Sequence, residues 1–113
     1  MGDDGEADVI DVLADEYVRT ILTRTREEPM SVQDLSDACG ADPSTIYRRV
    51  ERLTEVELLE DHQRLDPNGH HYKVYAASLQ EVRIRLDEDG YAVEVERKEP
   101  AADRFTRLYE GFK

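Results

Sequence analysis

The sequence predicts an α+β fold in which three helices precede two β-hairpins and a last helix follows them. Apolar residues recur every three or four positions up to about residue 57, which is typical of helices. Beyond residue 57 they alternate with polar residues, and the turn sequences Asp66-Pro67-Asn68-Gly69 and Asp89-Gly90 interrupt the alternation, which is typical of β-hairpins. Helical segments followed by strand segments indicate an α+β protein.

The first expected helix covers roughly residues 7–26. The apolar residues that predict it are spaced for one helical face: Ile10, Leu13, Tyr17 and Ile21. Pro29 ends this helix because proline disfavours helical backbone in the residue before it. Residues 1–8 are rich in Asp and Gly, and we expect them to be disordered.

A short second helix is expected over about residues 31–39. Ser31 and Asp34 form a capping-box pattern that opens it, with aspartate in place of the usual glutamate. Gly40 stands where a glycine commonly ends a helix.

The third helix begins directly afterwards. Asp42 is suited to the N-cap and Pro43 to the first helical position. Its buried stripe is predicted to be Ile46, Val50 and Leu53, and its outward residues Ser44, Thr45, Arg48 and Arg52. Two helices joined by a short turn containing glycine make a helix-turn-helix.

Two hairpins complete the prediction. The first pairs residues 58–65 with 70–77, so that residues 9–76 make a winged helix-turn-helix. The second covers 79–98, with a two-residue Asp89-Gly90 turn. That turn pairs Leu86 with Val93, Ile84 with Val95, Arg85 with Glu94, and Arg83 with Glu96. A longer, four-residue loop would instead pair Arg83 with Glu94 and leave Arg85 opposite Ala92.

Residues 77–113 are expected to belong to the same compact unit and to end in a helix that starts at Pro100. We expect this helix to form a homodimer, packing with the first helix, because so small a domain has little core to cover its apolar stripe. The alternative is that it folds back on its own domain. The residues assigned to dimerisation are Phe105, Leu108, Tyr109 and Phe112.

The charge of the chain is unusual. Its 113 residues carry a formal net charge of -12, from 27 acidic and 15 basic residues, and only three of the bases are lysines. An acidic, lysine-poor surface of this kind is typical of adaptation to a salt-filled cytoplasm. The single cysteine fits a reducing compartment, and no apolar segment approaches the length of a membrane span. These features predict a soluble, cytoplasmic protein.

Arginines nevertheless gather on the third helix, and this suggests double-stranded DNA as the partner. A recognition helix directs its N-terminal residues at base edges in the major groove. Arg48 is assigned a bidentate contact with guanine, while Arg49 and Arg52 are assigned to phosphates. Ser44, Thr45 and the Tyr47 hydroxyl complete the expected contacts on this helix. In the wing, the candidates are Arg64, His70, His71 and Lys73.

The stretch SVQDLSDACGADPSTIYRRVERLTEVELLE resembles the ArsR-type winged helix-turn-helix regulators, especially small members from salt-loving archaea. The resemblance covers residues 8–76, and LQEVRIRLDEDGYAVEVER followed by ADRFTRLYEGF is similar to the hairpin and terminal helix of those members. It implies a transcription regulator. Metal-sensing members carry a cysteine-rich motif in the helix-turn-helix, whereas only Cys39 is present here, so metal sensing is not implied.

The alternatives are a winged-helix module that binds only proteins and a ligand- or metal-responsive sensor. A metal is not expected, because neighbouring strand residues such as His70 and His71 point to opposite faces. Cys39 is expected to be a small buried apolar residue. No phosphate-binding loop, nucleophile elbow or His-Glu metal helix is present, so neither an enzyme nor a cofactor is expected.

Overall fold

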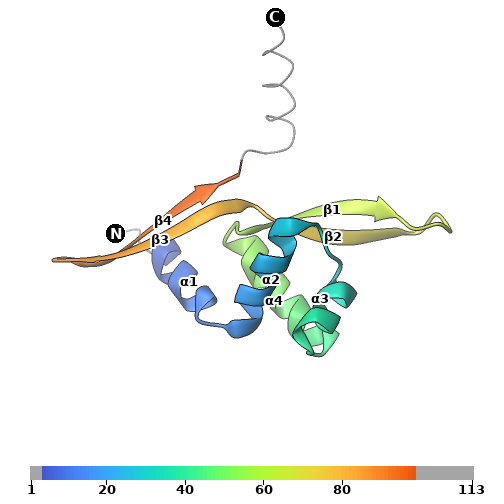
Figure 1. Cartoon of the computed structure of the whole chain (residues 1–113), viewed down its shortest axis with the longest axis horizontal. Helices are drawn as coiled ribbons and strands as arrows, with labels where there is room; N and C mark the ends of the chain where they lie inside the picture. The colour runs from blue at the N-terminus through green and yellow to red at the C-terminus, as the bar shows by residue number, and fades with distance from the viewer. Residues whose placement is uncertain (1–3, 99–113) are drawn as a thin grey trace, which may run out of the picture.

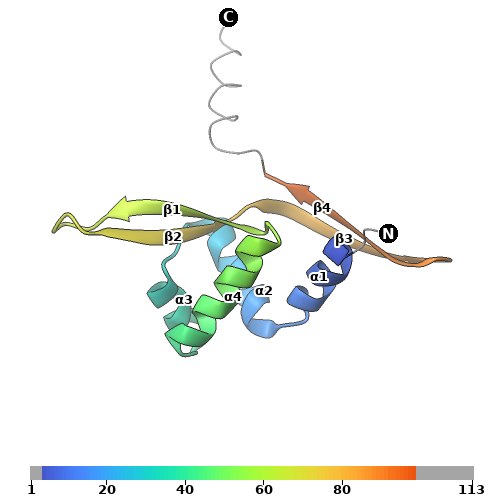
Figure 2. The ribbon, with the colours of Figure 1, turned by 180° about the vertical axis from the view of Figure 1, so that it is seen from behind.

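The computed structural model describes residues 4–98 and confirms the α+β architecture. Its elements are α1 (Asp4–Leu13), α2 (Glu16–Glu27), α3 (Val32–Cys39), α4 (Pro43–Glu55), β1 (Leu59–Leu65), β2 (His71–Ala77), β3 (Leu79–Asp87) and β4 (Gly90–Arg97). The two hairpins extend in opposite directions, and the helices lie together on one side of them (Figures 1 and 2).

The first helix is divided in two, so the prediction of one continuous helix over residues 7–26 was wrong. Asp15 ends α1 and caps α2: its carboxylate accepts hydrogen bonds from the backbone amides of Tyr17 at 2.8 Å and Val18 at 3.4 Å. The Arg19 guanidinium donates to the Leu13 carbonyl oxygen at 2.8 Å, and this carbonyl at the C-terminal end of α1 thereby has a hydrogen-bond partner. Apolar spacing alone did not reveal the break because both helices bury the same kind of face.

The helix α1 begins at Asp4, so the predicted disordered segment over residues 1–8 is helical from residue 4 onward. Val9 and Val12 of α1 are buried, and α1 contacts β4. This packing against a distant strand stabilises a helix whose Asp- and Gly-rich beginning suggested disorder.

Both helices of the predicted helix-turn-helix are confirmed. Ser31 and Asp34 form the complete capping box of α3, and Gly40 ends that helix in the left-handed region with φ 62°. Leu35 is fully buried, whereas Val32 and Ala38 are only partly buried. Asp42 caps α4, Pro43 is its first residue, and the stripe Ile46, Val50 and Leu53 is buried.

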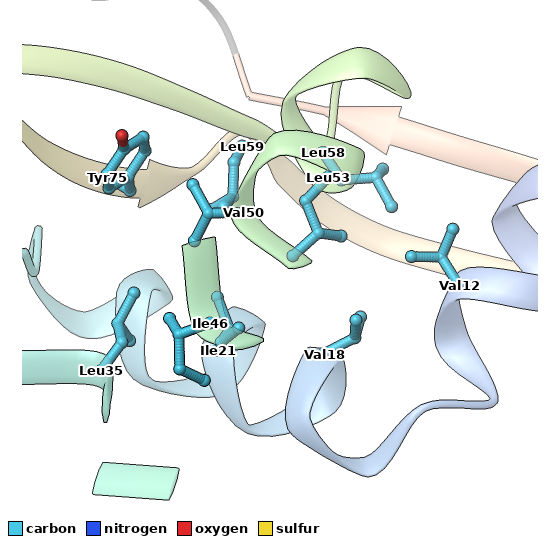
Figure 3. Close-up of a cluster of buried hydrophobic side chains, with 10 residues drawn as sticks. All are labelled: Val12, Val18, Ile21, Leu35, Ile46, Val50, Leu53, Leu58, Leu59 and Tyr75. Atoms are coloured by element: carbon cyan, nitrogen blue, oxygen red, sulfur yellow. The ribbon is translucent and has the colours of Figure 1, made fainter. Parts of the chain in front are cut away.

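The core lies between the helices and the proximal ends of the hairpins (Figure 3). It contains Val12, Val18, Ile21, Leu35, Ile46, Val50, Leu53, Leu58, Leu59 and Tyr75. An additional strand-like contact joins Met30 to β2, where the backbones of Met30 and Tyr75 exchange hydrogen bonds of 3.0 and 2.8 Å. The loop between α2 and α3 is thereby attached to the wing.

Strand β1 pairs antiparallel with β2 as predicted. A single residue, Ser78, separates β2 from β3, so the two hairpins follow each other directly. The Ser78 hydroxyl donates to the Glu57 carbonyl oxygen at 2.9 Å, and the Arg97 guanidinium donates to the same oxygen at 3.2 Å. The base of the second hairpin is therefore fixed to the C-terminal end of α4.

The predicted register of the second hairpin was wrong. Asp87 faces Gly90, and only Glu88 and Asp89 lie between the strands. The pairing is Leu86 with Tyr91, Arg85 with Ala92, Ile84 with Val93, Arg83 with Glu94 and Val82 with Val95. The Asp87 carboxylate accepts a hydrogen bond from the Asp89 amide at 2.9 Å, which begins the turn earlier than Asp89-Gly90 suggested. The expected terminal helix, including Phe105, Leu108, Tyr109 and Phe112, lies outside the described residues.

Candidate nucleic-acid interface

The helix α4 has one buried and one exposed side. Ile46, Val50 and Leu53 hold it against the core, and helices α2 and α3 and strand β1 contact it. Ser44, Tyr47 and Arg48 are exposed, while Thr45, Arg49 and Arg52 are partly buried. The structure thus places the N-terminal half of α4, with its polar side chains, at the protein surface.

Asp42 is the N-cap residue of α4 and binds the first turn of that helix. Its carboxylate accepts hydrogen bonds from both the hydroxyl and the backbone amide of Ser44. These two bonds, with a smaller contribution from the charge of Arg48, lower the pKa of Asp42. The Ser44 side chain is therefore part of the cap as well as a candidate DNA contact.

Arg48 is a predicted contact that the structure leaves exposed. It lies one turn into α4, is exposed, and makes no ion pair with any residue between 9 and 98. A guanidinium in that position can present its two parallel N–H donors to a base edge without first losing a protein partner.

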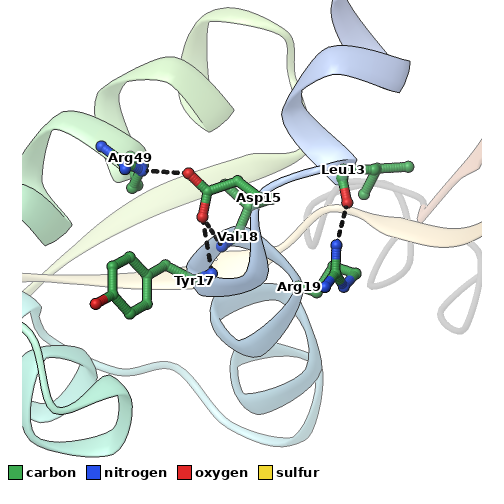
Figure 4. A network of polar contacts seen from close by, with 6 residues as sticks. All are labelled: Leu13, Asp15, Tyr17, Val18, Arg19 and Arg49. Carbon is green, nitrogen blue, oxygen red and sulfur yellow. Dashed lines mark hydrogen bonds and ion pairs between the residues drawn. The ribbon is translucent and has the colours of Figure 1, made fainter.

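Arg49 is held by a partly buried network at the α1–α2 junction (Figure 4). Its Nε lies 2.6 Å from Oδ2 of Asp15, and its guanidinium carbon lies 5.9 Å from the centre of the Tyr17 ring. Its side chain is only 34% exposed. This geometry directs Arg49 toward the carboxylate, whereas the sequence suggested a phosphate contact.

The pKa of Asp15 reflects the same network. Burial acts to raise it, but hydrogen bonds from Arg49, Tyr17 and Val18 and the charge of Arg49 together lower it below its ordinary value. Asp15 therefore connects α2 with the candidate recognition helix. The apolar spacing of residues 7–26 gave no sign of this role, although an aspartate followed by Glu16 in a first turn is a recognisable start of a helix.

Arg52, one turn beyond Arg48, has its guanidinium 3.7 Å from the carboxylate of Glu55. Its side chain is 42% exposed, and Glu55 is more exposed still. An exposed pair of this kind contributes little to stability.

The register of the first hairpin divides the predicted wing residues between two faces. Leu65 faces His71, and Gln63 faces Lys73, on the face that also carries Tyr75. Arg64 faces Tyr72 on the opposite side. His71 and Lys73 are therefore brought together on the side of α4, and Arg64 is separated from them.

Two of the wing's basic residues have acidic neighbours. Lys73 Nζ lies 3.4 Å from Asp61, a diagonal pair across the hairpin, and His70 Nδ1 lies 3.5 Å from Asp66 in the turn. All four predicted wing residues are exposed. The wing is thus a polar ribbon of mixed charge, and Arg64 and His71 are its two predicted contacts without an ion pair in the described part of the chain.

Within residues 4–98 the His, Cys, Asp and Glu side chains form no cluster of three or more that could hold a metal ion. His62 faces Val74 and binds Glu60 at 2.9 Å, so it does not approach the tandem histidines in register. Cys39 is partly buried against the core, and burial raises the pKa of its thiol. None of the described helices is long and apolar enough to span a membrane.

Helix α3, the turn at Gly40, helix α4 and the β1–β2 hairpin together define a winged helix-turn-helix protein. The family model described as a helix-turn-helix domain matches residues 13–62, which extend from the end of α1 into β1. A search of curated proteins returned no match for the sequence. The second hairpin lies outside the matched region.

Proposed function

We propose that this protein is a sequence-specific, homodimeric transcription regulator of the ArsR type that binds double-stranded DNA in a salt-rich cytoplasm. The observation that supports this most is the exposed Arg48 on the outward face of α4, within a winged helix-turn-helix, because Arg48 forms no ion pair with a side chain that the structure describes. In such domains the N-terminal half of the second helix enters the major groove. Ser44, Thr45 and Tyr47 would contribute from the same half of α4.

The overall negative charge does not oppose this proposal. Near molar salt the Debye length is only about 3 Å, so distant carboxylates repel DNA weakly and the local arginines determine binding. Arg48 would read a guanine and Arg52 would contact a phosphate. Arg64, His70, His71 and Lys73 would follow the backbone beside the site.

The Arg48→Ala substitution tests the proposal. We expect it to weaken binding to the preferred duplex by about 1–3 kcal/mol and to relax base preference at one position per half-site. Arg52→Ala should weaken binding to all sequences about equally, because phosphate contacts carry no sequence information.

Arg85→Ala is the matched control, because Arg85 is an equally charged, exposed residue on the second hairpin. Affinities from fluorescence anisotropy at a fixed, high salt concentration provide the measurement. Equal, sequence-independent losses from Arg48→Ala and Arg52→Ala would contradict the assigned roles. A folded protein that binds no duplex would instead indicate a module for protein partners.

A further inference from the structure

A groove of about 270 Å³ lies between α4 and the β1–β2 hairpin. We call it the α4–wing groove. The residues that matter here are Tyr47, Glu51 and Glu55 from α4 and Asp61, Lys73 and Tyr75 from the hairpin. This volume is slightly below the roughly 300 Å³ at which ligand pockets usually begin, so only a small molecule fits in the groove.

Tyr75 gives this groove an unusual feature. The residue is only 6% exposed, yet its hydroxyl forms no hydrogen bond with any residue in the described part of the chain. Burial raises the pKa of Tyr75, and the charged or ionisable groups that modify it further include Lys73, Tyr47, Asp61 and Glu51, all in the groove. Tyr75 itself lines the groove, and the hydroxyl of this buried residue is without a hydrogen-bond partner in the described part of the chain. Such groups are rare because leaving them unpaired costs free energy.

Negative charge dominates the groove. Its three carboxylates are accompanied by one lysine, Lys73, which lies 3.4 Å from Asp61. Glu55 has Arg52 as a partner outside the groove, but Glu51 makes no ion pair with a described residue. A cation is thus the species that this charge would attract.

The Tyr47 ring in the groove favours an organic cation over a metal ion as the ligand. Tyr47 is 51% exposed and lines one wall, so its ring can cover an alkylammonium stem and attract its positive charge. The carboxylates of the groove do not form a group of three at metal-binding geometry. Rings beside carboxylates are the arrangement that recognises alkylammonium groups.

We propose that the α4–wing groove binds a small organic cation with protonated primary amines. One ammonium group would lie between Glu51 and Asp61 and donate a hydrogen bond to the Tyr75 hydroxyl, and its alkyl chain would lie along the Tyr47 ring. The groove separates the candidate recognition helix from the wing. Bound cation would reduce the negative charge there and strengthen DNA binding, and this second step rests on the proposed function.

Titration calorimetry of the full chain without DNA tests the binding step. The probe is 1,4-diaminobutane, with uncharged 1,4-butanediol of the same length as the control ligand, at one fixed salt concentration. We expect saturable binding of one diamine per chain and no binding of the diol. Tyr75→Phe and Glu51→Gln should each weaken diamine binding at least about tenfold.

The matched controls are Tyr72→Phe, at an exposed position on the other face of β2, and Glu88→Gln, at the tip of the second hairpin. Both should bind the diamine like the wild type. Tyr75→Phe removes a hydroxyl without a partner, so the fold is not put at risk. Equal effects of Glu51→Gln and Glu88→Gln, or no diamine binding by folded protein, would overturn the proposal. Mg²⁺ binding at the same site with the same dependence on Glu51 would overturn the assignment to an amine.

The effect on DNA is measured separately. Saturating diamine should tighten wild-type duplex binding about fivefold or more, a coupling that Glu51→Gln should abolish. Diamine binding without any duplex binding would leave the groove assigned and refute the DNA function alone. Diamine binding with unchanged duplex affinity would overturn the regulatory step.

Discussion

Asp15 combines two roles in a single side chain, and substitutions can separate them. Asparagine caps helices about as well as aspartate but cannot form the ion pair with Arg49. We therefore expect Asp15→Ala to lower the free energy of unfolding by about 1–2 kcal/mol. Asp15→Asn should lower it by less than about 1 kcal/mol, because the pair is partly exposed. Urea denaturation at neutral pH measures both, and equal losses would show that the ion pair, which both variants lack, matters and the cap does not.

The same residue predicts a pH dependence. Because folding lowers the pKa of Asp15, the unfolded chain binds the proton more tightly, and the stabilising contribution is complete above the ordinary value of 3.8. It is lost as the pH falls through the lower pKa of the folded state. The stability difference between wild type and Asp15→Asn should therefore shrink below about pH 4. A difference that stays constant to pH 2 would contradict the role of the carboxylate charge.

The fold holds Glu57 in a strained backbone conformation. It follows α4 with φ 63°, the left-handed region that glycine adopts without steric cost, and its side chain is exposed. Its carbonyl oxygen holds Ser78 and Arg97, contacts that any residue can provide. Glu57→Gly should therefore raise the free energy of unfolding by about 1 kcal/mol. The control Glu51→Gly, within α4, should lower it by about 1 kcal/mol in the same urea experiment.

At the scale of elements, α1 connects the core to the second hairpin. Val12 is buried within the core cluster, and α1 also contacts β4, where Val93 is buried. Val12→Ala removes two buried methyl groups and should cost about 2 kcal/mol of unfolding free energy.

Ile84→Ala removes more carbon from the second hairpin but should cost less, because Ile84 is 49% exposed. Denaturation midpoints of the two variants provide the comparison. If Val12→Ala were neutral, α1 would not be packed as the structure shows.

The second hairpin also shows why its register was predicted incorrectly. A shift of two residues leaves every side chain on its original face, so the alternating pattern fits both registers equally well. Contacts outside that pattern select the observed register: Asp87 binds the Asp89 amide, and Arg83 pairs with Glu94 at 3.1 Å and with Glu81.

For the whole molecule, the main prediction concerns the oligomeric state. The sequence stripe Phe105, Leu108 and Phe112 suggests that the C-terminal segment forms the homodimer, and a two-fold axis suits a regulator that reads two half-sites. A chain ending at Pro100 should therefore be a monomer in light scattering at a salt concentration where the full-length protein is a dimer. If both have the same mass per particle, the dimer interface lies elsewhere.

The sequence by itself determined the elements whose signals are local. Caps at Ser31 and Asp42, the glycine at position 40 and the alternation of the hairpins each depend on a few neighbouring residues, and they predicted the helix-turn-helix and its wing correctly. The buried stripe of α4 was correct for the same reason, because helical spacing fixes which side chains share a face.

Tertiary structure decided the features that depend on distant partners. Asp15 separates α1 from α2 and meets Arg49, 34 residues further along the chain. Arg49 consequently points toward the carboxylate of Asp15, although its sequence neighbours resemble a DNA-binding face. The α4–wing groove likewise combines Glu51 with Asp61 and Tyr75, which share no sequence pattern. Side chains that are brought together only by packing leave no periodic signal, so their juxtaposition is visible only in the folded chain.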